Sequence, residues 1–253
     1  MTVNDGERIN KINDNVTLIE SESGLKFTTD AYLLSAYIRR PKGKCIRAAE
    51  LGAGTGVISL LACARGLSDE IVAYEVQPRF CDIIGRNIEY NGMSDRISVK
   101  CADVRDLTEA SEGGQFDLVF SNPPYMKPGT GKGNYSDEKN IARHEVMGGI
   151  SDFCAAASRL CKFGGTFYIV YRPERTCELF SALTSNGFEP KLLTYIYPDV
   201  KSRPSLLLCA AKRGGKSGLT VTPPLYMYEG GRTESDTVKK IYENGSFPEE
   251  YTL

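Results

Sequence analysis

The chain has 253 residues, of which 41% are hydrophobic and 25% are charged. This length and composition suit one large globular domain, and they exclude a small disulfide-stapled scaffold and wholesale disorder. The 31 basic and 32 acidic residues give a net charge of −1, so the total charge offers no argument for a nucleic-acid-binding protein, although a local basic patch matters more than the sum.

The eight cysteines are spread along the chain, and no two of them lie closer than seven positions. With His144 as the single histidine, the clustered ligands of a zinc site are missing, so we expect no metal. This spacing fits a reducing compartment better than a secreted disulfide framework. The polar N-terminal segment lacks the apolar core of a signal peptide, and no apolar run is long enough to span a membrane. We therefore expect a cytoplasmic protein without a membrane partner.

The N-terminal segment predicts a short extension before the main domain. Residues 1–24 are polar, with a weak apolar rhythm that favours a hairpin. Residues 27–38 predict a helix, because Thr29 or Asp30 can cap it and an apolar face follows. Pro41 then ends the helix.

Strands and helices alternate after this extension. The expected strands are short apolar runs, at residues 45–51, 70–75, 97–101, 116–120, 166–171, 191–197 and 205–211. The expected helices lie at residues 57–65, 78–90, 150–161 and 174–186. The alternation predicts an α/β fold with a seven-stranded, mostly parallel sheet and helices on both faces. We expect the last strand to be antiparallel, because its link to the preceding strand is too short for a crossover helix.

A glycine-rich turn, ELGAGTG at residues 50–56, follows the first of these strands. Glycines permit a tight turn and let the backbone approach a ligand closely, although such turns also occur as plain connectors. The spacing departs from the G-x-G-x-x-G of dinucleotide-binding folds, because Val57 stands where the third glycine is required. A GK[ST] phosphate-binding pattern is also missing from it. The turn therefore suits a ligand without a pyrophosphate.

Acidic residues follow the next two strands, at the carboxyl edge where such sheets bind ligands. Glu75 lies 19 positions after Gly56, and a carboxylate there can accept both hydrogen bonds of a ribose diol. Asp103 can meet the exocyclic amine of an adenine, while Val104 packs on its ring. Taken alone, Glu75 also fits an exposed strand-end acid and Asp103 a turn cap. Together with the glycine turn, Glu75 favours a ribose contact.

The sequence SNPPY at residues 121–125 carries the strongest chemical signal. Its two prolines stiffen the loop and remove two backbone donors. The side-chain oxygen of Asn122 and the carbonyl of Pro123 can then both accept from one planar NH2 group. Tyr125 offers a flat face on which a ring can stack. The competing interpretation is a rigid connecting loop with a surface tyrosine, which the position at the carboxyl edge disfavours.

These motifs resemble the class I S-adenosylmethionine-dependent methyltransferases with an NPPY motif, and within them the bacterial tRNA1(Val) (adenine-37-N6)-methyltransferase family. The resemblance covers nearly the whole chain, and its marks are FTTDAYLL at 27–34, ELGAGTG, SNPPY, ARHE at 142–145 and PLYMY at 224–228. It implies a Rossmann-like fold and S-adenosylmethionine as cofactor, with S-adenosylhomocysteine as product. It also implies direct in-line methyl transfer to the N6 amine of an adenine beside the anticodon of a tRNA.

The resemblance assigns roles residue by residue. Asn122, Pro123 and Tyr125 would hold the target base, and these are the expected catalytic residues. Asp30 would lie over the cofactor. The other expected cofactor-binding residues are those of the glycine turn and the strand ends, namely Glu50, Gly52, Gly54, Gly56, Glu75, Asp103 and Val104, together with Asn122.

Basic runs provide candidate contacts to RNA in three parts of the chain. The candidates are Arg39 and Arg40, then Lys127, Lys132 and Arg143 in the loop after SNPPY, and finally Lys201 and Arg203. A single run is more often solvated surface charge, but three runs in a chain of net charge −1 imply segregated charge. The expected domain organisation is an extension at 1–43, a methyltransferase domain at 44–213 and a tail at 214–253 that packs on the domain. We expect a monomer.

Other interpretations of these motifs stay open. A protein-glutamine N5-methyltransferase presents the same planar amide, but such enzymes usually carry an N-terminal helical domain, for which this chain leaves little room. Methylation of a ribosomal RNA base fits as well, whereas a DNA adenine methyltransferase needs a target-recognition region that is not evident. A cofactor-binding module in an RNA or ribosome assembly is the alternative outside enzymes, and Asn122 and Tyr125 argue against it. Val57 and SNPPY disfavour a nicotinamide oxidoreductase.

Overall fold

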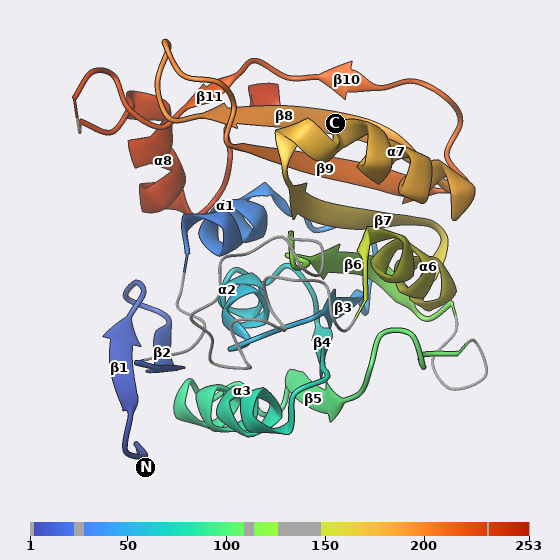
Figure 1. Cartoon of the computed structure of the whole chain (residues 1–253). Helices are drawn as coiled ribbons and strands as arrows, with labels where there is room; N and C mark the ends of the chain where they lie inside the picture. The colour runs from blue at the N-terminus through green and yellow to red at the C-terminus, as the bar shows by residue number, and fades with distance from the viewer. Residues whose placement is uncertain (1–2, 23–27, 109–113, 126–147, 232, 253) are drawn as a thin grey trace, which may run out of the picture.

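A computed structural model describes residues 3–22, 28–108, 114–125, 148–231 and 233–252. At its centre lies a nine-stranded sheet (Figure 1). In spatial order the strands are β10 (Thr220–Val221), β8 (Phe188–Tyr197), β9 (Leu206–Arg213), β7 (Cys161–Tyr171), β6 (Phe116–Ser121), β3 (Arg47–Leu51), β4 (Glu70–Glu75) and β5 (Ile97–Cys101), and β11 (Leu225–Tyr226) also pairs with β8.

The direction of the strands confirms the predicted fold class. Strands β3 to β7 pair in parallel, whereas β9 is antiparallel to both of its neighbours, β7 and β8. Seven strands therefore follow the prediction, with the last of them antiparallel. The two-residue strands β10 and β11 are additions that the sequence did not predict, and both run parallel to β8.

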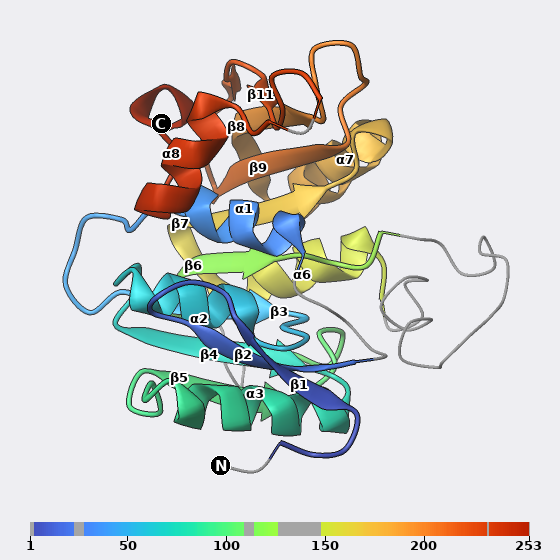
Figure 2. The same cartoon turned by 90° about the vertical axis from the view of Figure 1, so that its left-hand side faces the viewer.

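Helices cover both faces of the sheet (Figures 1 and 2). One buried cluster lies under α1 (Thr29–Tyr37), α2 (Val57–Ala64), α3 (Pro78–Tyr90) and α8 (Asp236–Asn244). The other lies under α6 (Ile150–Leu160) and α7 (Thr176–Ser185), which follows a short 3-10 helix, η1 (Pro173–Arg175). Strand β4 shows how the two clusters arise. Ala73 faces the first cluster and its neighbours Val72 and Tyr74 face the second, which is why this strand is a continuous apolar run.

The predicted N-terminal hairpin is present as β1 (Glu7–Lys11) and β2 (Thr17–Ser21), which pair antiparallel. One buried side chain, Asn87 of α3, attaches the hairpin to the domain. Its Oδ1 accepts the amide of Ile19 at 2.6 Å, and its Nδ2 donates to the carbonyl of Ile19 at 3.0 Å. The same Nδ2 donates to the carbonyl of Thr55 in the glycine turn, also at 3.0 Å. A single amide thus joins the hairpin to the turn.

The segment after β9 lies against the domain rather than apart from it. Helix α8 begins after Ser235, whose Oγ accepts the amide of Val238 at 3.2 Å, and it ends at Gly245 with a left-handed φ of 63°. Val238 and Ile241 are fully buried in the cluster beneath α1 and α2. A final 3-10 turn, η2 (Glu249–Tyr251), buries Tyr251 in the same cluster.

No helix of the described residues has the length and apolar character needed to cross a membrane. No group of three or more His, Cys, Asp or Glu side chains gathers there as a metal site would require.

Candidate active site

Strands β3, β4 and β6 bring the glycine turn and the SNPPY loop side by side. Leu51, the last residue of β3, pairs with Tyr74 of β4 on one side and with Ser121 of β6 on the other. The hydroxyl of Ser121 donates to the carbonyl of Leu51 at 2.7 Å and is fully buried. The two motifs therefore begin at one hydrogen-bonded point on the carboxyl edge of the sheet.

The glycine turn needs glycine for backbone reasons. Gly52, Gly54 and Gly56 have φ values of 69°, 58° and 78°, a left-handed conformation that other residues adopt with strain. The amide of Gly52 donates to the carbonyl of Tyr74 at 2.9 Å, which folds the turn back toward β4. A Cβ on Gly56 would lie 3.2 Å from Ile84, so α3 also approaches the turn too closely for a side chain.

Glu50 is buried beneath this turn, with only 1% of its surface exposed. Its Oε2 accepts the amide of Ser59 at 2.9 Å, and the Ser59 hydroxyl donates to the same oxygen. Gly56, the residue before α2, has no side chain to cap the helix, so Glu50 satisfies an amide of its first turn. Burial raises the pKa of Glu50 to about 8, and the charge of Glu75 adds to the shift. This supporting role was not predicted from the sequence.

Glu75 lies across the turn from Glu50, at the end of β4. One carboxylate oxygen accepts the amide of Gly54 at 2.8 Å, and the other accepts the amide of Gln77 at 3.0 Å. Burial raises the pKa of this carboxyl, although both amide hydrogen bonds oppose the shift. Glu75 is thus fixed against the glycine turn at the carboxyl edge of the sheet.

Asp103 and Val104 follow β5 at the same edge. Arg105 pairs with the Asp103 carboxylate, with its Nη2 2.6 Å from Oδ2, and this pairing lowers the carboxyl pKa. Val104 is 5% exposed and packs in the cluster that contains Phe153. Val104 is therefore a buried apolar residue at this edge, and Asp103 already has a cationic partner that was not predicted from the sequence.

Asn122 and Tyr125 meet Asp30 at the edge of the sheet. The Tyr125 hydroxyl donates to Oδ2 of Asp30 at 3.0 Å and also contacts Oδ1 of Asn122. Burial raises the pKa of Tyr125 well above its usual range, and the adjacent Asp30 charge raises it further. Tyr125 therefore remains a neutral hydrogen-bond donor. The structure brings together these three predicted residues from two distant segments, with Pro123 buried between Asn122 and Tyr125.

The residues around the Tyr125 ring were not predicted from the sequence. The guanidinium of Arg172 lies 4.7 Å from the ring centroid, and the ring of Tyr171 packs edge-on at 6.0 Å. Arg175 donates to the Tyr125 carbonyl and lies over the Tyr171 ring. All three follow or end β7, so the rule that ligands bind at the carboxyl ends of parallel strands would have found them.

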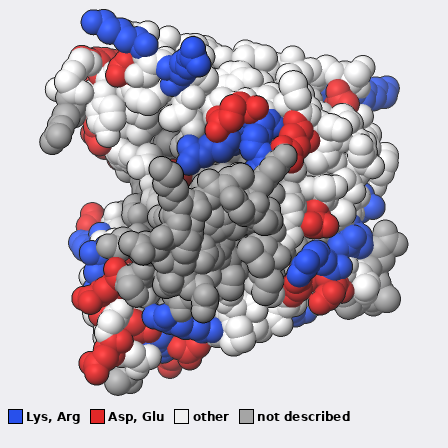
Figure 3. Space-filling model, viewed as in Figure 1, with Lys and Arg blue, Asp and Glu red and all other residues white. Residues whose placement is uncertain are grey.

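The predicted RNA-contacting residues differ in their exposure and in their hydrogen-bond partners. Lys201 and Arg203 are exposed in the turn between β8 and β9, and because β8 runs in the same direction as β7, this turn lies at the catalytic edge. Arg40 is paired with Asp69 at 2.7 Å, and Arg39 donates to the carbonyls of Ala36 and Phe247. Lys127, Lys132 and Arg143 lie outside the described residues. Figure 3 shows basic and acidic side chains together along the border of the grey area at this edge.

Comparisons with known proteins agree with this architecture. A family model described as Conserved hypothetical protein 95 matches residues 36–141. Among solved structures, a predicted O-methyltransferase from Agrobacterium tumefaciens aligns with a TM-score of 0.68 and 25% identity, over 87% of this chain and 98% of that one. The fold, the glycine turn and these similarities define the chain as an S-adenosylmethionine-dependent methyltransferase with a Rossmann-like fold.

Curated relatives of the chain belong to a more specific group of methyltransferases. The chain is similar to the tRNA1(Val) (adenine(37)-N6)-methyltransferase of Dyadobacter fermentans, with 26% identity over 84% of this chain and 86% of the relative. It is also 27% identical to the protein of the same name from Shewanella sediminis, over 91% of this chain and 90% of that one. The predicted resemblance to this group of bacterial methyltransferases is thereby confirmed.

The described residues fit the cofactor of this class. The turn presents backbone without side chains at Gly52, Gly54 and Gly56, as a ligand held close to the backbone requires. Glu75 accepts the amides of Gly54 and Gln77, one on each oxygen. The Val76 amide and the Gln77 side chain also hydrogen-bond to this carboxylate, so a pair of ribose hydroxyls would share it with these groups.

Proposed function

We propose that the chain transfers the methyl group of S-adenosylmethionine to the N6 amine of an adenine in tRNA. The observation that carries the proposal is the position of Asn122 and Tyr125 beside the glycine turn, where β3, β4 and β6 end. The names of the relatives support adenine 37 of a tRNA as the substrate.

When bound, S-adenosylmethionine supplies an electrophilic methyl group on a positively charged sulfur. The chain holds this cofactor through the turn and the strand ends. The proposed contacts are Gly52, Gly54 and Gly56 with the amino-acid part, Glu75 with the ribose, and Asp103 with Val104 beside the adenine. Asp30 and Asn122 would lie beside the bound cofactor, and Glu50 acts by fixing the first turn of α2.

Asn122 and Pro123 orient the target amine. The side-chain oxygen of Asn122 and the carbonyl of Pro123 accept its two N–H groups, which turns the nitrogen lone pair away from the ring and toward the methyl group. Positive charge develops on this nitrogen during transfer, and fixed acceptors stabilise it. Alignment of the two reacting atoms accounts for much of the remaining rate enhancement.

Tyr125 and Asp30 set the orientation of the Asn122 amide. The Tyr125 hydroxyl has one proton and lies near two acceptors, Oδ2 of Asp30 and Oδ1 of Asn122. It donates preferentially to Asp30, because a charged acceptor forms the stronger hydrogen bond. If the side-chain amide of Asn122 is flipped so that Oδ1 and Nδ2 exchange positions, Nδ2 donates to the hydroxyl oxygen of Tyr125. This orientation directs Oδ1 of Asn122 toward the target amine, where an acceptor is needed.

The Tyr125 ring holds the base after it has been turned out of the anticodon loop. Arg172 covers one face of the ring with its guanidinium at 4.7 Å from the centroid. The target adenine stacks on the opposite face, and such stacking contributes about 1–3 kcal/mol. Arg172 also holds the β8–β9 turn through the carbonyl of Ser205 at 3.0 Å, which supports a contact of Lys201 and Arg203 with the bound RNA.

The test uses purified protein, labelled S-adenosylmethionine and tRNA from cells that lack the modification. The RNA is digested, and the labelled nucleoside is identified by mass spectrometry. We expect N6-methyladenosine in one tRNA species and no label with the Asn122→Ala variant. Label in ribosomal RNA, or in a protein glutamine, would replace tRNA adenine by that acceptor. Tight cofactor binding without methyl transfer to any acceptor would indicate a cofactor-binding module.

A further inference from the structure

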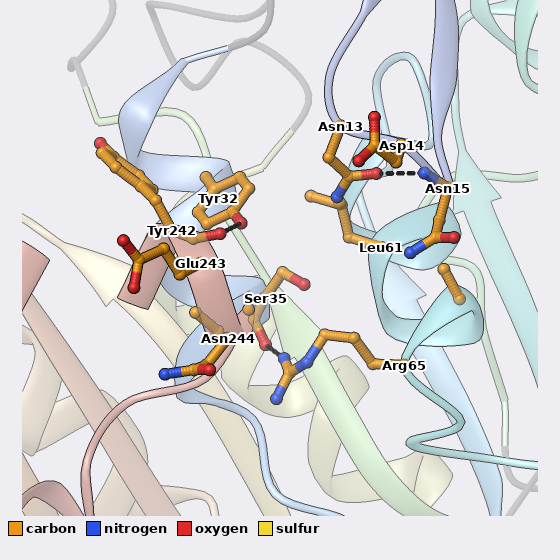
Figure 4. Close-up of a pocket in the computed structure, with 13 residues that line it drawn as sticks. Asn13, Asp14, Asn15, Tyr32, Ser35, Leu61, Arg65, Tyr242, Glu243 and Asn244 are labelled. Atoms are coloured by element: carbon orange, nitrogen blue, oxygen red, sulfur yellow. Dashed lines mark hydrogen bonds between the residues drawn. The ribbon is translucent and has the colours of Figure 1, made fainter. Parts of the chain in front are cut away.

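A partly open cavity of about 320 Å³ lies outside the catalytic edge. It is bounded by the turn between β1 and β2, by α1 and α2, and by the end of α8 (Figure 4). In Figure 3 the outline of the molecule is indented on the left-hand side, between the hairpin and the part formed by α8. None of the roles assigned above uses this cavity.

The cavity contains a guanidinium that lacks an acidic partner. Arg65 donates from Nη1 to the carbonyl of Ser35, and within the described part of the chain no carboxylate pairs with it. Its hydrocarbon stem packs against α8, where a Cβ on Gly245 would lie 3.4 Å from Cδ of Arg65. Burial lowers the pKa of Arg65 to about 10, and the neighbouring charge of Arg39 lowers it further. The guanidinium nevertheless stays charged at neutral pH.

The two carboxylates at the cavity do not neutralise this charge. Asp14 is bound to Lys11 at 2.8 Å, and 94% of its side chain is exposed, so it faces solvent. Glu243 is exposed at the end of α8. The positive group is therefore inside the cavity while the acidic groups lie at its rim.

Amide groups add neutral donors to the wall opposite Ser35. Oδ1 of Asn13 accepts the amides of Asn15 and Val16, both at 2.9 Å, which holds the β1–β2 turn in shape. Figure 4 shows the side chains of Asn13 and Asn15 on this wall, facing Tyr32 and Ser35 across the cavity. A guanidinium with amide donors nearby is a combination suited to a phosphate group, which guanidinium binds in a bidentate manner.

We propose that this cavity binds a backbone phosphate of the RNA substrate, close to the nucleotide that is methylated. The proposal rests on the proposed function. Helix α1 carries both Asp30 of the catalytic site and Ser35 of the cavity, and five residues of helix span about 7–8 Å. Arg65 ends α2 about 12–14 Å from the glycine turn by the same measure. A strand that places one nucleotide in the catalytic site therefore has a neighbouring phosphate within reach of Arg65.

The test compares Arg65→Gln with Arg96→Gln. Arg96 is a matched control, because it also donates to a carbonyl, that of Cys63 at 3.3 Å, but does not line the cavity. We expect Arg65→Gln to raise KM for tRNA about tenfold, as loss of a charged hydrogen bond does, with little change in kcat. The salt dependence of tRNA binding should lose about one unit of slope. The cofactor affinity of Arg65→Gln should stay at the wild-type level. The KM for tRNA and the salt slope of Arg96→Gln should also equal those of the wild type.

Arg65→Lys keeps the charge and protects the test against a folding defect. It should restore part of the tRNA affinity, because lysine keeps the charge but not the bidentate geometry, and equal effects of Lys and Gln would overturn the proposal. Unchanged KM and salt slope in Arg65→Gln, with wild-type tRNA methylation intact, would overturn it as well. Absence of RNA methylation by the wild type would instead refute the proposed function. Binding of millimolar inorganic phosphate that depends on Arg65, without an effect on tRNA, would assign the cavity to a free anion.

Discussion

The hydroxyl of Tyr125 lies 3.0 Å from Oδ2 of Asp30, although the two residues are 95 positions apart. The contact joins the first turn of α1 to the loop after β6, so the N-terminal extension takes part in the candidate active site. Asp30 lies outside the strands of the sheet, and in the proposed mechanism its effect on the target amine passes through Tyr125 to Asn122. This arrangement makes Asp30 a positioning residue whose role depends on one hydroxyl group.

A double-mutant cycle on these two residues tests that role. Tyr125→Phe keeps the ring and removes the hydroxyl, and we expect it to lower the single-turnover rate about tenfold, the effect of one hydrogen bond. Asp30→Ala should have a similar effect in the wild type and almost none in the Tyr125→Phe background. Additive losses would show that Asp30 acts independently of Tyr125.

Asn122→Ala should remove the fixed acceptor of the target amine. Loss of one such preorganised group typically lowers kcat about 100- to 1000-fold. The cofactor should still bind, because the glycine turn and Glu75 do not depend on this side chain. Calorimetric titration with S-adenosylhomocysteine measures cofactor binding. A joint loss of binding and turnover would indicate that Asn122 has a structural role.

Glu75→Ala should weaken cofactor binding about 10- to 100-fold, because hydrogen bonds to a charged acceptor are lost. Glu70→Ala is the control, since Glu70 lies at the other end of β4 and pairs with Arg47 at 2.8 Å. Affinities for S-adenosylhomocysteine in the two variants provide the comparison. Equal affinity in both would exclude Glu75 from the ribose contact.

The buried carboxyl of Glu50 predicts a pH dependence of stability. Burial raises its pKa from 4.5 to about 8, so the folded state favours the protonated form. The stability that this group contributes is complete below about pH 4.5 and is lost as the pH rises toward 8. Glu50→Gln keeps a neutral acceptor for the Ser59 amide and removes the titration.

Urea unfolding of the wild type and of Glu50→Gln at several pH values measures this effect. The free energy of unfolding of the wild type should fall relative to that of the variant between about pH 5 and pH 8. Parallel curves would mean that the Glu50 carboxyl is charged in the folded protein and compensated elsewhere.

The fold could be predicted where a strand is buried on both faces of the sheet, because its sequence is then a continuous apolar run. Strand β4 and helix α3 have the predicted limits, because a proline or polar turn marks each end. Strand β7 begins at Cys161, whereas the predicted strand begins at 166. The prediction starts later because Gly164 and Gly165 resemble strand-breaking residues. A Cβ on Gly165 would lie 2.6 Å from Sγ of Cys161, so this glycine permits close packing within the strand.

The candidate site was predictable to the extent that its residues follow strands. Glu75, Asn122 and Tyr125 could be placed because parallel strands end at one edge. The contact between Asp30 and Tyr125 could not be predicted, since it depends on how α1 packs on the sheet. The pairing of Asp103 with Arg105 depends on a side-chain conformation that spacing alone does not determine.

The buried amide of Asn87 has a consequence for how the two ligands bind. It joins β2, whose hairpin turn borders the Arg65 cavity, to the carbonyl of Thr55 in the glycine turn. We expect an RNA phosphate that fixes the hairpin to restrict the turn as well, which would couple the two sites energetically. Such coupling is reciprocal, and bound tRNA should tighten the cofactor by the same factor by which the cofactor tightens tRNA.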